Sequence, residues 1–168
     1  MAYRVTIVDD SNIDAEYVQS ILETWAKDRQ ADIRTEVFPS AEAFLFRYAE
    51  DKEWDILLLD IEMGAMDGVS LAKKIRQENE TVQILFVTGF ADYISEGYEV
   101  AALHYLMKPV KQEKLFAVFH EGTVIQQGTH AELVANESGK YYELWTAQAQ
   151  YYTEKERKSI DLNVSPGV

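Results

Sequence analysis

Short apolar runs alternate with helix-length segments over residues 1 to about 120 of the chain. The runs at 56–59 and 84–87 are apolar throughout, which is typical of strands that helices cover on both faces. Five such units predict an α/β fold with a doubly wound, five-stranded parallel sheet. The predicted strands are 3–8, 33–38, 56–59, 84–87 and 104–107.

Polar residues mark where the helices between these strands begin. Ser11, with Asp14 three residues later, and Ser40, ahead of an Ala- and Phe-rich stretch, are typical helix N-caps. Further helices are predicted at 68–79, 93–101 and 111–119. In such folds ligands bind beyond the carboxyl ends of the strands, so we expect the chemistry at that edge of the sheet.

The composition narrows the class of protein. Hydrophobic residues make up 47% of the 168-residue chain, enough to bury a substantial core, and the absence of cysteine excludes a disulfide framework and a thiolate zinc site. The formal net charge of -13 argues against direct nucleic acid binding, because phosphates need clustered Lys and Arg. No apolar stretch reaches the roughly 18 residues of a membrane helix, and the N-terminus lacks a secretory signal pattern. We therefore expect a soluble, cytoplasmic protein without membrane association.

Polar residues follow four of the five predicted strands. They are Asp9 and Asp10 after the first strand, Asp60 after the third, Thr88 after the fourth and Lys108 after the fifth. Parallel strands present their carboxyl ends at one edge, so these side chains should meet there. Three ionised carboxylates repel one another unless a cation lies between them, and hard oxygen ligands favour Mg2+. A carboxylate beside Mg2+ can attack a phosphoryl group, whose oxygens a hydroxyl and an amine then neutralise.

Each of these residues also has an ordinary structural interpretation. The acidic pair could be a helix cap, Thr88 a turn residue and Lys108 a solvated surface charge. Their joint placement at the ends of successive strands favours a functional site.

The motifs VDDSN, LLLDIEMGAMDG, FVTGF and HYLMKP resemble, in order and spacing, those of the receiver domain of two-component response regulators. The resemblance covers residues 1–119 and implies the flavodoxin-like receiver fold. It also implies that Asp60 is both the phosphoacceptor and a metal ligand, with Asp10 as a direct metal ligand and Asp9 close by.

The same resemblance implies roles for the remaining motif residues. Glu62 would contribute to the metal site through its backbone carbonyl, and Thr88 and Lys108 would hold the phosphoryl oxygens. Tyr105 matches the aromatic switch of the family, whose ring turns inward when Thr88 is drawn to the phosphoryl group; a half-buried strand tyrosine is the alternative. The bond between Lys108 and Pro109 is expected to be cis.

Some features differ from the common pattern of that family. The stretch FVTGFADYISEGYEVAALHYLMKPVKQEKLF most resembles receivers joined to LytTR-type DNA-binding domains, and no such domain follows in this sequence. Gly64 stands where proline is usual, which predicts a more mobile loop. Glu62 and Phe90 occupy positions that tune the phosphoryl lifetime in the family.

Residues 120–168 differ in character and are predicted to be an appended tail with a short strand or loop and helices. Thr129 and Glu132 form a capping box, and a second helix with an apolar stripe is expected at 141–158. The tail resembles the end of an ABC transporter ATP-binding domain, but no GxxxxGKS/T loop is present, so we expect neither transport nor ATP hydrolysis. The stripe either mediates dimerisation or docking, or covers apolar surface beside a short fifth helix.

These features together predict a phosphoacceptor receiver module of a two-component phosphorelay, in which Mg2+-dependent phosphorylation of Asp60 switches a protein-interaction surface. Beyond its own phosphoryl transfer and dephosphorylation, it would not be an enzyme. The expected partners are a sensor histidine kinase or small phosphodonor, and a downstream protein or a second copy. The alternatives are a non-phosphorylated interaction module and a haloacid-dehalogenase-like phosphatase, whose nucleophile precedes its acidic pair, the reverse of the order here.

Overall fold

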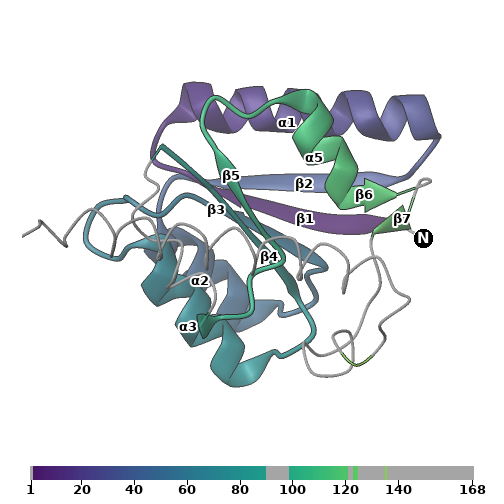
Figure 1. Cartoon of the computed structure of the whole chain (residues 1–168). Coiled ribbons are helices and arrows are strands. Elements are labelled where there is room, and N and C mark those ends of the chain that lie inside the picture. The colour runs from purple at the N-terminus through teal and green to yellow at the C-terminus, as the bar shows by residue number, and fades with distance from the viewer. Residues whose placement is uncertain (1, 90–98, 121–122, 125–134, 136–168) are drawn as a thin grey trace, which may run out of the picture.

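The computed structural model of the chain describes residues 2–89, 99–120, 123–124 and 135. Within these residues, five parallel strands form a sheet of order β2-β1-β3-β4-β5 (Figure 1). The strands are β1 (Tyr3–Val8), β2 (Ile33–Phe38), β3 (Ile56–Leu59), β4 (Gln83–Thr88) and β5 (His104–Met107). The predicted parallel sheet is confirmed, and β4 is one residue longer at each end than predicted.

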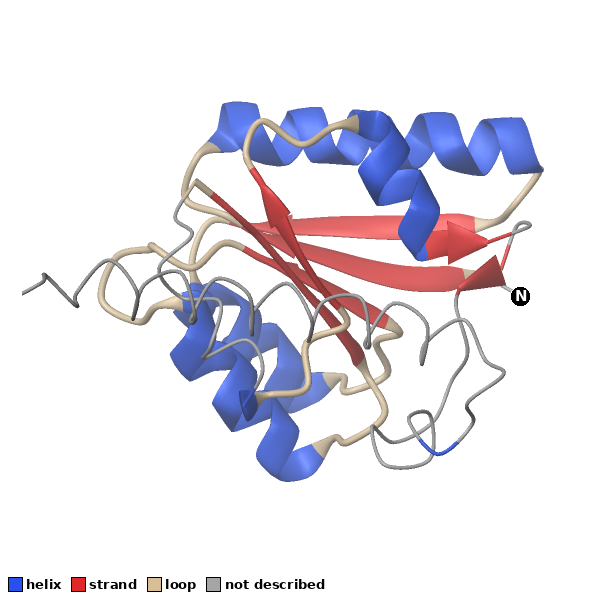
Figure 2. Cartoon of the chain, in the orientation of Figure 1, coloured by secondary structure: helices blue, strands red, loops and turns tan. Residues whose placement is uncertain are grey.

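Helices cover both faces of this sheet. As Figures 1 and 2 show, α1 and α5 lie on one face and α2 and α3 on the other, which is the predicted doubly wound arrangement. The helices are α1 (Asn12–Arg29), α2 (Ala41–Glu50), α3 (Gly68–Glu78) and α5 (Gln112–Val118). Most of the predicted helix at 93–101, and the two helices predicted in the tail apart from residue 135, lie outside the described residues.

Side-chain caps fix where the first two helices begin. The Asp14 amide donates a hydrogen bond to Ser11 Oγ at 3.3 Å, and the Ala43 amide donates to Ser40 Oγ at 3.1 Å. Each cap satisfies an N–H group that the first helical turn would otherwise leave without a partner. Both predicted serine caps are therefore confirmed, and three residues separate the end of β1 from the start of α1.

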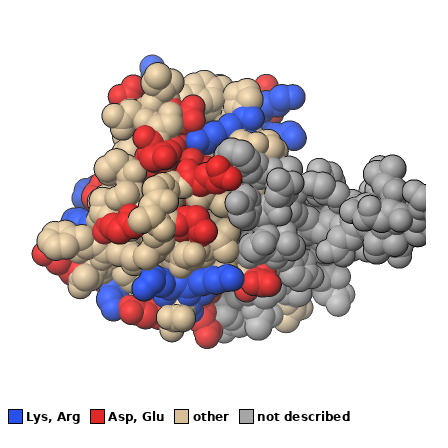
Figure 3. Space-filling view, turned by 90° about the vertical axis from the view of Figure 1, so that its left-hand side faces the viewer, with Lys and Arg blue, Asp and Glu red and all other residues tan. Residues whose placement is uncertain are grey.

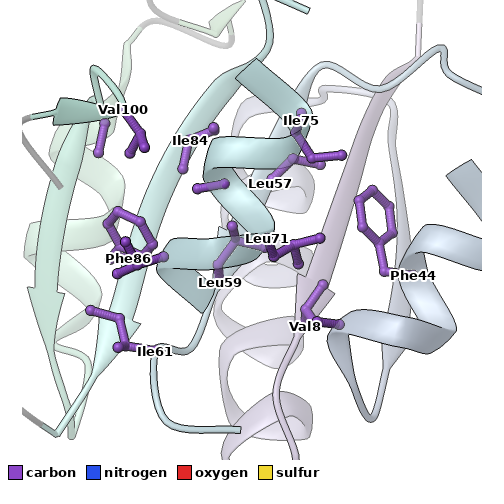
Figure 4. Close-up of a cluster of buried hydrophobic side chains, with 14 of the residues drawn as sticks. Val8, Phe44, Leu57, Leu59, Ile61, Leu71, Ile75, Ile84, Phe86 and Val100 are labelled. Carbon is purple, nitrogen blue, oxygen red and sulfur yellow. The ribbon is translucent and has the colours of Figure 1, made fainter. Parts of the chain in front are cut away.

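Two hydrophobic clusters hold the helices to the sheet. Ile56 and Leu58 of β3 belong to the cluster under α1 and α5, whereas Leu57 and Leu59 belong to the cluster under α2 and α3. Figure 4 shows the second cluster, with Leu57 and Leu59 among the buried side chains of α2, α3 and the sheet. Burying one such side chain contributes about 1.5–3 kcal/mol to the stability of the fold. Because both faces of β3 are covered, every side chain of this strand is buried, and its sequence is apolar throughout.

A short antiparallel hairpin follows α5. Its strands, β6 (Phe119–His120) and β7 (Thr123–Val124), pair Phe119 with Val124. Phe119 is only 3% exposed, and the centroid of its ring lies 4.6 Å from the ring centroid of Trp25, which is fully buried in α1. The first residue after α5 is therefore part of the core, while the division of the chain into residues 1–119 and a tail stays a prediction.

Helix α3 begins in direct contact with the loop that carries Asp60. The Gly68 amide donates a hydrogen bond to the Ile61 carbonyl at 2.8 Å, and a Cβ at Gly68 would overlap the Asp60 carbonyl oxygen. Only glycine therefore fits at this close approach of two backbone segments. The contact sets the position of the loop that follows β3.

Replacing Gly68 by alanine should destabilise the protein. We expect Gly68→Ala to lower the free energy of unfolding by about 1–3 kcal/mol, the usual cost of forcing an extra methyl group into packed structure. Urea denaturation followed by circular dichroism would measure the change. Gly89→Ala is the matched control, because a Cβ at Gly89 meets nothing within 4 Å. Equal stability of the two variants would contradict the close approach.

Candidate functional site

The carboxyl edge of the sheet gathers the polar residues predicted from the sequence. β1 lies between β2 and β3, so the segments that follow β1 and β3 emerge side by side at the point where the strand order reverses. The Asp60 amide donates to the Val8 carbonyl at 2.9 Å, which fixes Asp60 next to the end of β1. In Figure 3, Asp and Glu side chains gather on this face, and Lys and Arg side chains lie beside them.

Asp60 is held almost out of contact with solvent. Its residue exposure is 6%, and the Ile61 amide donates to its Oδ1 at 2.8 Å. That bond leaves Oδ2 facing the Lys108 ammonium, with 3.2 Å between the two atoms. One carboxylate oxygen is thus fixed by the backbone and the other is directed at a cation.

Three acids at this edge lie close enough together to share one cation. Asp9, Asp10 and Asp60 each offer one carboxylate oxygen, and these atoms all lie within 4.8 Å of one another. Asp9 is buried and Asp10 exposed, so the cluster opens to solvent on one side. Oxygen donors of this kind, with open positions for water, fit Mg2+ in number and chemistry.

Lys108 is the cation of the site. Its Nζ lies 2.7 Å from Asp9 Oδ2, 2.9 Å from Asp14 Oδ2 and 3.2 Å from Asp60 Oδ2. Burial by itself lowers the pKa of Lys108. Hydrogen bonds to Asp9 and Asp14 and the charge of Asp60 raise this pKa by more than burial lowers it, so the net pKa lies above the ordinary value. The lysine therefore stays charged at neutral pH. The peptide bond between Lys108 and Pro109 is cis, as the resemblance implied.

Thr88 links the end of β4 to both Asp60 and Lys108. It is fully buried, and its carbonyl accepts a hydrogen bond from the Lys108 amide at 2.8 Å. Burial raises the pKa of Asp60 and the charge of Asp9 raises it further, whereas Lys108 and a hydrogen bond with the Thr88 side chain lower it. The net pKa of Asp60 lies above the ordinary carboxyl value, because desolvation and the neighbouring acid outweigh the favourable partners.

Three of the remaining predicted residues have clear positions. Tyr105 is buried at 8% exposure, with its ring 6.1 Å from that of Phe86, so the ring points into the core in this structure. Glu62 is exposed in the loop after Asp60. Gly64 has a φ of 41°, a left-handed conformation that the fixed ring of proline excludes. Phe90 lies outside the described residues.

Sequence reasoning identified Asp14 only as part of a helix start, yet its carboxylate contacts Lys108. Asp14 lies in the first turn of α1, and Ser11, the N-cap of this helix, directly follows the acidic pair, so the start of α1 brings the Asp14 carboxylate to the same edge of the sheet. The contact lowers the pKa of Asp14, because the hydrogen bond from Lys108 favours the ionised carboxylate. The contact joins residues 94 positions apart, so no local spacing in the sequence indicates it.

Comparisons with known proteins define the family. Residues 5–120 match the response regulator receiver domain family, so the chain belongs to that family and is a receiver domain of a two-component response regulator. The transcriptional regulatory protein NatR of Bacillus subtilis (strain 168) is 30% identical over 116 residues, covering 69% of this chain and 48% of NatR. The sensory transduction protein LytT of the same organism is 30% identical over 112 residues, covering 67% of this chain and 44% of LytT.

Solved structures show the same fold. A CheY-like response regulator receiver domain protein from Methanospirillum hungatei JF-1 has a TM-score of 0.60 and 25% identity, covering 69% of this chain and 89% of that one. The N-terminal domain of a response regulator/sensory box/GGDEF 3-domain protein from Carboxydothermus hydrogenoformans has a TM-score of 0.59 and 27% identity, covering 68% and 89%. The flavodoxin-like receiver fold predicted from the sequence is therefore confirmed.

The chain corresponds to only part of each curated relative. The chain spans about half the length of the curated relatives that it matches, at 48%, 42% and 44% of the first three. Receiver domains bind Mg2+ at an acidic pocket, and they are generally not enzymes in the ordinary sense. Neither the phosphatase nor the non-phosphorylated module is favoured, and the ABC-like resemblance of the tail has no support from these matches. Among the described residues, no helix has the length and apolar character to cross a membrane.

The raised pKa of Asp60 gives a test of stability. The unfolded chain ionises this carboxyl at its ordinary pKa, so at neutral pH the ionised group costs the folded state free energy. We expect Asp60→Asn to raise the Tm at pH 7, and the difference to narrow as the pH is lowered to about 3, below the ordinary carboxyl pKa, where Asp60 is protonated in both states.

Thermal unfolding followed by circular dichroism across this pH range would check the prediction. Asp28→Asn, an exposed acid at the far end of α1, is the matched control and should change the Tm little. A lower Tm for Asp60→Asn at pH 7 would show that the contact with Lys108 outweighs burial.

Proposed function

We propose that the chain accepts a phosphoryl group on Asp60 and thereby switches a protein-interaction surface. The observation that carries the proposal is the geometry of Asp60: a nearly buried carboxylate, one oxygen of which faces Lys108 at 3.2 Å, beside two further acids. A purely structural ion pair would not require the second and third carboxylates, whose repulsion costs stability. Phosphoryl transfer, by contrast, uses both the acids and the lysine.

The transfer itself is a displacement at phosphorus. A carboxylate oxygen of Asp60 attacks the phosphorus atom, an acyl phosphate O–P bond forms, and the bond from phosphorus to the donor breaks. The donor leaves with that electron pair, as acetate when the donor is acetyl phosphate. Lys108 would donate to one transferred oxygen and the Thr88 hydroxyl to another, so that charge developing on the phosphoryl group is neutralised.

Asp9, Asp10 and Asp60, together with the backbone carbonyl of Glu62, would hold Mg2+. When bound, the ion neutralises phosphoryl oxygens and the surplus negative charge of the acids. The carboxylates present are hard oxygen donors close enough to share one cation. Asp10, the exposed acid of the cluster, would take part in binding from the solvent side.

The switch would run through Thr88 and Tyr105. Thr88 is the last residue of β4, and Tyr105 on the neighbouring β5 pairs with Phe86 of β4, so a shift of Thr88 would act on the strand that carries the tyrosine. The surface next to them includes Met107, a hydrophobic residue that is 43% exposed. A downstream protein or a second copy of the chain would bind there, and a sensor histidine kinase or a small phosphodonor would supply the phosphoryl group.

Intact-mass measurement after incubation with acetyl phosphate and Mg2+ tests the phosphoacceptor. We expect the wild-type protein to gain one phosphoryl mass only when Mg2+ is present, and Asp60→Asn to gain none. Lys108→Met should fold but take up the group much more slowly, because the developing charge then lacks its cation. A folded wild-type protein that gains no mass would refute the phosphoacceptor and favour an interaction module that is never phosphorylated.

Mg2+ titration calorimetry separates the predicted ligands from one another. Asp10→Asn should weaken Mg2+ binding about tenfold, because affinity for hard cations follows the number of charged ligands. Glu62→Gln should bind Mg2+ nearly as the wild type does, because residue 62 would contribute only its backbone carbonyl. Equal losses in the two variants would show that the Glu62 side chain is itself a ligand, and unchanged binding by Asp10→Asn would remove Asp10 from the set.

A further inference from the structure

The Lys108 ammonium has no hydrogen-bond donor to spare. A lysine ammonium carries three N–H donors, and three carboxylate oxygens surround Nζ, those of Asp9 at 2.7 Å, Asp14 at 2.9 Å and Asp60 at 3.2 Å. A phosphoryl oxygen on Asp60 can take the place that Asp60 Oδ2 gives up, but Asp9 and Asp14 still occupy the other two donors and offset the charge of the ammonium.

Asp14 differs from the other two carboxylates. Asp9 and Asp60 belong to the cluster of acids that could share a cation, whereas Asp14 does not. Its side chain is 45% exposed at the start of α1, while those of Asp9 and Asp60 are 4% and 8% exposed. The cap of α1 uses the backbone amide of Asp14, whereas its carboxylate contacts the Lys108 ammonium and the Ser11 side chain.

We propose that Asp14 is a positioning residue that competes with the incoming phosphoryl group for Lys108 and so slows loading from small anionic phosphodonors. The inference rests on the proposed function of Asp60. Asp14 occupies one donor of Lys108, offsets part of its charge and places a like charge beside the dianionic donor. Each of these three effects opposes binding of the phosphoryl oxygens.

The sign of the effect follows from what remains when Asp14 is removed. Asp9 holds Lys108 at the shortest of the three distances and is buried, so the amine stays directed at Asp60 without Asp14. Losing Asp14 therefore frees a donor without releasing the lysine. If Asp14 were instead the main anchor of Lys108, its loss would slow loading.

The test compares initial rates of phosphoryl uptake from acetyl phosphate at saturating Mg2+, by intact mass, for the wild type, Asp14→Asn and Asp14→Glu. Asp14→Asn should load about two- to tenfold faster, the scale of one half-exposed charged hydrogen bond. Asp14→Glu restores the carboxylate and should load at close to the wild-type rate. The advantage of Asp14→Asn should shrink as salt is raised to about 0.5 M, because salt screens exposed charges.

Glu16→Gln is the matched control, since it removes one exposed acid from the same helix and should load like the wild type. Faster loading by Glu16→Gln to the same extent would reduce the effect to net charge and overturn the role of Asp14. If the wild type loads and Asp14→Asn loads at the same rate or more slowly, the competition by Asp14 is overturned and the proposed function of Asp60 is not. No loading by the folded wild type would overturn the proposed function, and this inference with it.

Discussion

The contact between the Lys108 ammonium and its three carboxylates is the interaction on which the site depends. The strand order of the sheet brings Asp9 and Asp60 together where neither reaches much solvent, and two such ionised acids are not stable side by side without a nearby cation. Lys108, from the far edge of the sheet, supplies one positive charge and so joins the ends of β1, β3 and β5 to the start of α1. One lysine does not balance Asp9, Asp10, Asp14 and Asp60, and this surplus of negative charge is what makes the edge receptive to a divalent ion.

Much of the fold was predictable because its determinants are local. β3 is a continuous apolar run since both of its faces are covered, and Ser11 and Ser40 cap helices through amides only three residues away. The ends of β4 were missed for a physical reason: Gln83 and Thr88 are polar, and nothing in their identity indicates that both are buried. Burial of a polar side chain depends on partners supplied by other elements, which a local pattern does not contain.

The site likewise contains residues that were predictable from the sequence and residues that were not. The residues after β1, β3, β4 and β5 were predictable because topology alone brings the ends of parallel strands together. Asp14 was not identified as a site residue, since its partner Lys108 is 94 positions away and a charged residue in the first turn of a helix is ordinary. Arg76 shows the same limit: its guanidinium donates to the carbonyls of Val82 and Val100, contacts that helical periodicity does not reveal. Roles that depend on motion, as proposed for Tyr105, are not visible in a single arrangement of the chain.

The packing of Phe119 on Trp25 bears on where this receiver ends as a folding unit. The helix that closes the fold stops at Val118, but the next side chain is 3% exposed against a tryptophan that is itself fully buried. A chain cut immediately after α5 would keep every helix and strand of the main sheet and still leave an aromatic-sized void beside α1, the helix that carries Asp14. Any partner sequence grafted onto this receiver should therefore be joined beyond Phe119, because that residue belongs to the receiver by packing.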